Sequence, residues 1–167
     1  HLVIRRQRQM CIRDRRTGLQ KASLYHRFPG GKEEMVLAVL ERAGAWLENN
    51  AFEPLRGTGD LKKRLINFSK CLREFYEDGD ASCLLYTLSF SPEDSDVRKS
   101  IKLGMSYWIQ ILTEVLQEAG NNKKLARRRA EDILARLQGT LIVARGISNS
   151  EPFLRFLREL PSEVLQN

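Results

Sequence analysis

The sequence "KASLYHRFPGGKEEM", from Lys21 to Met35, places a polar, aromatic and basic segment directly before a helix start. Its Pro29-Gly30-Gly31 tripeptide is a strong helix breaker. Two glutamates follow in the first turn of the next helix, where the helix dipole favours negative charge. The sequence therefore predicts a short helix over residues 20–28 and a long helix over residues 32–50.

Positive charge is concentrated at the start of the chain. The net charge is +7: residues 1–32 hold nine Lys and Arg against one acid, whereas residues 33–167 hold 19 basic and 20 acidic side chains. A basic end on a nearly neutral body indicates an anionic partner, and nucleic acid is the first candidate.

Residues 1–16 weaken this inference. The run "RQRQMCIRDR", Arg6 to Arg15, has neither helical nor strand periodicity, and it resembles the translated end of a sequencing adapter. We expect residues 1–16 to be a non-native segment. The alternative is a basic arm that binds nucleic acid.

Composition disfavours several classes of protein. No apolar run approaches the roughly 20 residues that span a bilayer, so we expect a soluble, cytoplasmic protein without a membrane partner. Cys11, Cys71 and Cys83 lack CxxC spacing, so we expect no disulfide framework, metal site or cofactor. The two histidines lie in no nucleophile or metal-ligand motif, so we do not expect an enzyme. A redox trigger through Cys71 and Cys83 is an open alternative.

Apolar residues recur at three- and four-residue spacing along nearly the whole chain, which predicts an all-α fold. A loop is expected over Pro54 to Gly59, with Asp60 as the N-cap of the next helix. Ser91 is expected to cap a later helix before Pro92. The side chains of Arg127 to Arg129 are expected to be solvated. The helices predicted after residue 50 cover residues 60–78, 82–90, 92–119, 123–147 and 151–160.

The last two predicted helices are apolar on more than one side, which indicates an interface. The run "LQGTLIVARGI" and the helix over residues 151–160 carry more apolar surface than a small bundle needs. Gly139 would let another helix approach closely. We therefore expect a homodimer through the last two helices, the alternative being two ordinary core helices.

The segment "GLQKASLYHRFPGGKEEMVLAVL", Gly18 to Leu40, resembles the end of the DNA-binding domain of the TetR family of bacterial transcriptional repressors. The shared pattern is a turn Gly, a recognition helix with Leu-Tyr-x-x-Phe, a short break and Lys-Glu-Glu. The resemblance implies a TetR-like helical bundle, in which residues 17–50 are the remnant of a helix-turn-helix domain with its connecting helix. Residues 51–167 would form a regulatory domain for ligand binding and dimerisation.

The resemblance implies a regulator that binds double-stranded operator DNA and is released by a small-molecule effector. On a helix from Gln20, Leu24 and Phe28 share one face and can anchor it. The remaining Lys and Tyr side chains suit phosphate contact, and the Ser and His side chains can reach base edges. Each alone could equally be a solvated side chain. The expected DNA contacts are Lys21, Ser23, Tyr25, His26 and Lys32.

The family has two helices before the position of Gly18, and residues 1–17 do not encode them. The first helix of a helix-turn-helix motif crosses the DNA backbone. We therefore expect the chain as given to bind operator DNA poorly or not at all.

The resemblance also implies an effector pocket among the helices of residues 60–147. Arg145 is the most distinctive candidate, because a charge within "LIVARGI" needs an ion-pair partner, exposure or a ligand anion. Plain core packing is the alternative for the other candidates. An alternative function is a helical dimerisation or scaffold protein without a ligand. The expected lining residues are Phe68, Cys71, Phe75, Cys83, Tyr86, Met105, Trp108 and Arg145.

Overall fold

The computed structural model describes residues 21–81, 83–92 and 95–166. Within these ranges every regular element is a helix, which confirms the predicted all-α fold. The predicted non-native segment, residues 1–16, lies outside the described residues. None of the described helices has the length and apolar character that a membrane span requires.

The chain divides into two units, residues 1–39 and residues 40–167. In the first unit, α2 (Lys21–Arg27) is followed by a turn and by the start of α3 (Gly31–Leu47), as predicted. Gly31 has a φ of +72°, a conformation that glycine adopts without the steric cost of a Cβ. Glu34 accepts a hydrogen bond of 2.7 Å from the Gly30 N–H, which stabilises the start of α3.

The helix after the break does not end at Asn50, and the loop predicted at Pro54 is wrong. A π-helical segment, η1 (Glu48–Phe52), continues from α3 and leads into α4 (Glu53–Arg56). Pro54 lies in the first turn of α4, a position where helices tolerate its missing N–H. The non-helical connection is therefore confined to residues 57–60.

Asp60 caps α5 (Leu61–Phe75) as predicted, because its side chain accepts a hydrogen bond from the Lys63 N–H. A 3-10 turn, η2 (Glu77–Gly79), follows, and the short α6 (Leu84–Leu88) comes after it. Gly79 has a φ of +102°, and a Cβ there would lie 3.1 Å from the ring of Phe153. Both features require glycine at this turn.

The cap predicted at Ser91 is wrong. Ser95 caps α7 (Asp96–Glu118) by accepting from the Arg98 N–H. Asn122 caps α8 (Lys123–Gly146) in the same way through the Leu125 N–H.

The last helix, α9 (Glu151–Leu165), continues past the predicted end at Leu160 and contains Pro161. The ring of Pro161 and the side chain of Val164 are buried, and they extend the apolar face of α9 by another turn. We attribute the longer helix to this burial, which offsets the hydrogen bond that proline cannot donate.

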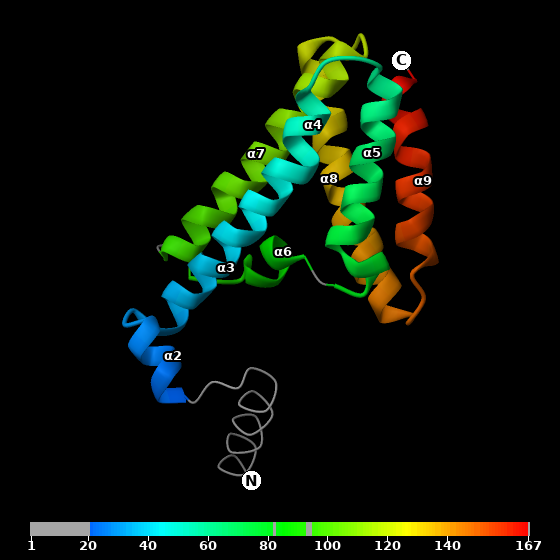
Figure 1. Cartoon of the computed structure of the whole chain (residues 1–167). Helices are drawn as coiled ribbons and strands as arrows, with labels where there is room; N and C mark the ends of the chain where they lie inside the picture. The colour runs from blue at the N-terminus through cyan, green and yellow to red at the C-terminus, as the bar shows by residue number, and fades with distance from the viewer. Residues whose placement is uncertain (1–20, 82, 93–94, 167) are drawn as a thin grey trace. The chain divides into compact units, whose positions relative to one another are not determined.

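Helices α5, α7, α8 and α9 form the core of the second unit. In Figure 1, α5 lies beside α9, and these two helices pack along their length. Helix α7 packs against α8 in the same way. At the centre, the ring of Phe52 from η1 meets the ring of Trp108 edge to face at 4.8 Å and the ring of Phe68 at 6.2 Å.

Candidate functional site

The side chains predicted to contact DNA lie in the first unit, on α2 and at the start of α3. Ser23, Tyr25, His26 and Lys32 are exposed, and Tyr25 has an exposed fraction of 40%. The backbone of Lys21 is the first residue of α2, but its side chain is outside what the structure describes. The polar face of α2 is therefore accessible, as a DNA contact requires.

A pocket of about 530 Å³ lies between the α6 region and the last turns of α8. It brings together three of the predicted lining residues, Cys83, Tyr86 and Arg145. Residues that share the pocket but were not predicted are Ala81, Thr87, Phe90, Gln138, Leu141, Ile142 and Gly146.

The walls of this pocket are mainly apolar, and two aromatic rings contribute to them. The rings of Tyr86 and Phe90 meet edge to face with centroids 5.8 Å apart. The Thr87 hydroxyl donates to the Cys83 carbonyl at 3.0 Å, so its single O–H donor is already used locally. The Arg145 guanidinium is exposed, and its Nη2 donates to the Asp80 carbonyl at 3.2 Å.

The two described cysteines have different surroundings. The buried Cys83 thiol accepts a hydrogen bond of 3.6 Å from the Tyr76 hydroxyl. The Cys71 thiol donates to the Asn50 carbonyl at 3.0 Å. Burial, with a smaller effect from Glu74, raises the pKa of Cys71 and so lowers its thiolate fraction.

The other predicted lining residues lie elsewhere. Phe68 and Trp108 are buried in the core, and Phe75 packs against Trp46 with ring centroids 5.3 Å apart. Met105 lines a separate groove on α7 with Phe90. The structure therefore assembles the part of the predicted set from α8 and the α6 region, and it places the aromatic residues of α5 and α7 in or against the core.

Helical spacing on α8 could have identified more of the pocket. Gln138, Leu141, Ile142 and Arg145 recur three and four residues apart, so they share one face of the helix. Counting backwards from Arg145 in such steps leads to this face. Phe90 could have been found in the same way, because it follows the predicted lining residue Tyr86 by four positions within the helix predicted over residues 82–90.

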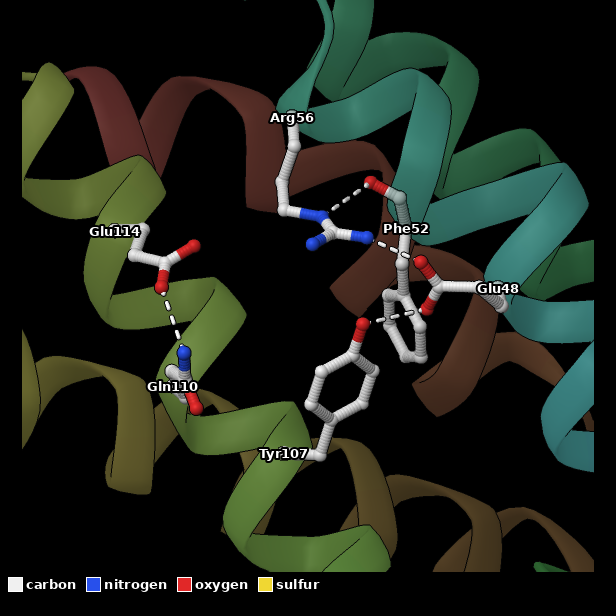
Figure 2. A network of polar contacts seen from close by, with 6 residues as sticks. All are labelled: Glu48, Phe52, Arg56, Tyr107, Gln110 and Glu114. Atoms are coloured by element: carbon white, nitrogen blue, oxygen red, sulfur yellow. Dashed lines mark hydrogen bonds and ion pairs between the residues drawn. The ribbon is translucent and has the colours of Figure 1, made fainter.

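A polar network that the sequence did not predict joins η1 to α4 and α7. Figure 2 shows the Glu48 carboxylate between the side chains of Arg56 and Tyr107. Arg56 forms an ion pair with Glu48 and also donates to the Phe52 carbonyl. Tyr107 donates to Glu48 at 2.7 Å, and this bond raises the pKa of Tyr107.

Acidic, histidine and cysteine side chains do not gather into a group of three or more suited to a metal ion in the described part of the chain.

Comparison with known proteins gives two matches. Residues 66–159 match the family described as "Transcriptional regulator LmrA/YxaF-like, C-terminal domain".

The chain is also 22% identical over 149 residues to the HTH-type transcriptional regulator LmrA of Bacillus subtilis (strain 168). That alignment covers 87% of this chain and 79% of the relative. No solved structure matches the chain significantly.

Proposed function

The chain belongs to the TetR-family transcriptional regulators with an LmrA/YxaF-like C-terminal domain, and on this basis we propose that it is a repressor released from operator DNA by a small molecule. The proposal places it in the cytoplasm, where such DNA lies, and assigns it no catalytic role. Residues 17–50 would contain the DNA-binding remnant and the helix that connects it to the rest of the chain. Residues 51–167 would bind the effector and form the dimer.

The observation that carries the proposal is the pocket between the α6 region and α8. It lies within residues 66–159, the part of the chain that matches the regulatory domain of the family. Its volume falls in the range of small-molecule sites, and mainly apolar walls with few polar groups are typical of them. Its residues Cys83, Tyr86 and Arg145 are the proposed effector contacts.

Contacts within the second unit link the pocket to the end of α3, and through them effector binding would change the position of that helix end. Leu85 of α6 approaches Gly104 of α7 so closely that a Cβ on Gly104 would lie 3.2 Å from it. Further along α7, Tyr107 bonds to Glu48, which directly follows the last residue of α3. A shift of α6 would therefore displace α7 and, through the Tyr107–Glu48 bond, the residues that follow α3.

We propose that the active form is a homodimer through the last two helices, with α8 providing most of the apolar contact. The side chains of Val143 and Ile147 are 49% and 59% exposed. Gly139 has open space where a Cβ would stand. The apolar residues of α9, in contrast, are largely buried inside the protomer.

The test is a selection of DNA fragments by the purified protein. The gene is first sequenced upstream of codon 17, and its natural product is expressed and mixed with genomic fragments. We expect enrichment of one two-fold symmetric site among the bound fragments. Lys32→Gln and Tyr25→Phe should weaken binding to all sequences and reduce its salt dependence, because both residues are assigned to phosphates. Ser23→Ala and His26→Ala should instead relax the preference at individual base pairs.

Lys63→Gln is the matched control, because Lys63 is also exposed in the first turn of a helix. Unchanged operator affinity in the Lys32→Gln, Tyr25→Phe double variant would contradict the assignment. A polypeptide of residues 1–167 should bind DNA weakly and without sequence preference, because residues 1–17 show no helical periodicity. Sequence-specific binding by it at physiological salt would refute this part of the proposal.

The second candidate function is a helical dimerisation or scaffold protein without a ligand. The exposed apolar side chains on α8 are compatible with it. The two functions differ in the pocket: a scaffold protein should keep its thermal stability unchanged across a library of small hydrophobic molecules.

A further inference from the structure

We infer that the effector is an amphipathic anion, with an apolar body held between the α6 region and α8 and a single negative charge that pairs with Arg145. This inference rests on the proposed function, because it names the ligand class of the same pocket. It follows from the charge and the geometry of the residues that line the pocket.

The apolar body is indicated by the walls. Leu141 and Ile142 contribute aliphatic surface from α8, and the edge-to-face pair of Tyr86 and Phe90 contributes aromatic surface. Burial of apolar ligand surface against such walls is favourable by roughly 25 cal/mol per Å². A fully polar ligand would not gain this energy.

The charge is indicated by Arg145. Among the described residues that line the pocket, it is the charged one, and no carboxylate lies with it. None of the ion pairs in the described part of the chain involves its guanidinium. A guanidinium carries several N–H donors, and the bond to the Asp80 carbonyl uses one of its two terminal nitrogens. An anionic group can therefore bind to the remaining donors, and a cationic ligand would be repelled.

A second account of Arg145 makes no reference to a ligand. The residue lies in the last turn of α8, where the helix dipole favours a cation. Under that account the affinity of the pocket for a ligand should not depend on the ligand's charge. The two accounts are separated by two probes that share one skeleton and differ in a single charge.

The test is a fluorescence titration of the full chain with 1-anilinonaphthalene-8-sulfonate and with its neutral analogue N-phenyl-1-naphthylamine. We expect the sulfonate to bind about tenfold more tightly, the effect of one charge-assisted contact. Arg145→Gln should abolish this difference by weakening the sulfonate alone. Arg155→Gln, on the exposed side of α9 and away from the pocket, should leave both affinities unchanged.

A second variant, Thr87→Trp, tests where the probes bind. Thr87 is an exposed residue of the pocket wall, and a tryptophan there would fill part of the pocket. The variant should therefore have a reduced affinity for both probes. Equal affinity of the two probes, or equal weakening of both by Arg145→Gln, would overturn the anionic class while leaving an effector pocket in place. Unchanged binding of both probes to Thr87→Trp, in a variant with native circular dichroism, would overturn the inference and the proposed effector site together.

Discussion

Tyr107 of α7 donates a hydrogen bond of 2.7 Å to the Glu48 carboxylate, across 59 positions of sequence. The same carboxylate pairs with Arg56, whose guanidinium carbon lies 5.9 Å from the centroid of the Tyr107 ring. Three elements, η1, α4 and α7, therefore meet at one side chain. Through this side chain, η1, which continues α3, is held against α4 and α7.

Tyr107→Phe should lower the free energy of unfolding by about 1 kcal/mol, because it removes a partly solvated hydrogen bond to a charged acceptor. Urea denaturation followed by circular dichroism measures the difference. Tyr86→Phe is the control, because no hydrogen bond of its hydroxyl is found among the described residues, and it should change stability by less than about 0.5 kcal/mol. Equal stability losses in the two variants would contradict a role for the Glu48 contact.

Tyr76 should make the protein sensitive to alkaline pH. Burial, with a contribution from Cys83, raises the pKa of Tyr76 well above its usual value. The unfolded chain therefore releases this proton first, so the stabilising contribution is complete below about pH 10 and is lost as pH rises further. The unfolding free energy of Tyr76→Phe, measured between about pH 8 and about pH 11, should fall less steeply than that of the wild type. Parallel curves would show that the phenol ionises freely in the folded state.

Arg129 should contribute more to stability than its neighbours in the basic run of α8. It was expected to be solvated, but its guanidinium donates to the Asn121 side chain and to the Glu163 and Gln166 carbonyls. Both carbonyls lie at the C-terminal end of α9, where backbone acceptors lack partners one turn further along the helix, although that of Glu163 also accepts from the Gln166 N–H. Arg129→Met should cost about 2 kcal/mol in urea denaturation.

Arg128→Met is the matched control for this variant, because Arg128 is exposed on the same turn of α8. It should change stability by less than about 0.5 kcal/mol. A similar loss for both arginines would mean that the charge of the run matters rather than the cap on α9.

Val143→Glu should convert the proposed dimer into a monomer, because a carboxylate would be buried without a partner at the α8 contact. Sedimentation equilibrium measures the change, which should exceed a factor of about 100 in the dissociation constant. Leu103→Glu places the same charge on the exposed side chain of α7 and should leave the association unchanged. A Val143→Glu protein that stays dimeric would place the interface elsewhere.

The helices were largely predictable, because periodicity and capping are local properties. The Asp60 cap acts within a few residues of its position, and the structure has it where it was predicted. The break after α2 is also present, and α3 begins at Gly31, one residue before the predicted start. The errors arose where distant packing changed a local preference. Pro54 was interpreted as a breaker, yet the neighbouring Phe52 and Leu55 are buried in the core, and the helix continues through the proline.

The pocket was predictable only in part. Arg145 was identified because a charge in an apolar run is anomalous in any fold, and it does line the pocket. Phe68 and Trp108 are aromatic residues on apolar helix faces, as pocket residues often are, but both rings pack against Phe52 in the core. A sequence pattern predicts which side chains are buried. It does not predict which of the buried side chains line a cavity.

The sequence by itself determined the all-α class, most helix starts and the short polar helix before α3, because these depend on chemistry within one or two helical turns. The tertiary structure alone decided that Glu48 meets Tyr107, that Arg129 caps α9 and that Arg145 shares a pocket with Tyr86. Each of these joins residues from different helices, and their meeting depends on how the helices pack rather than on any local preference of the chain.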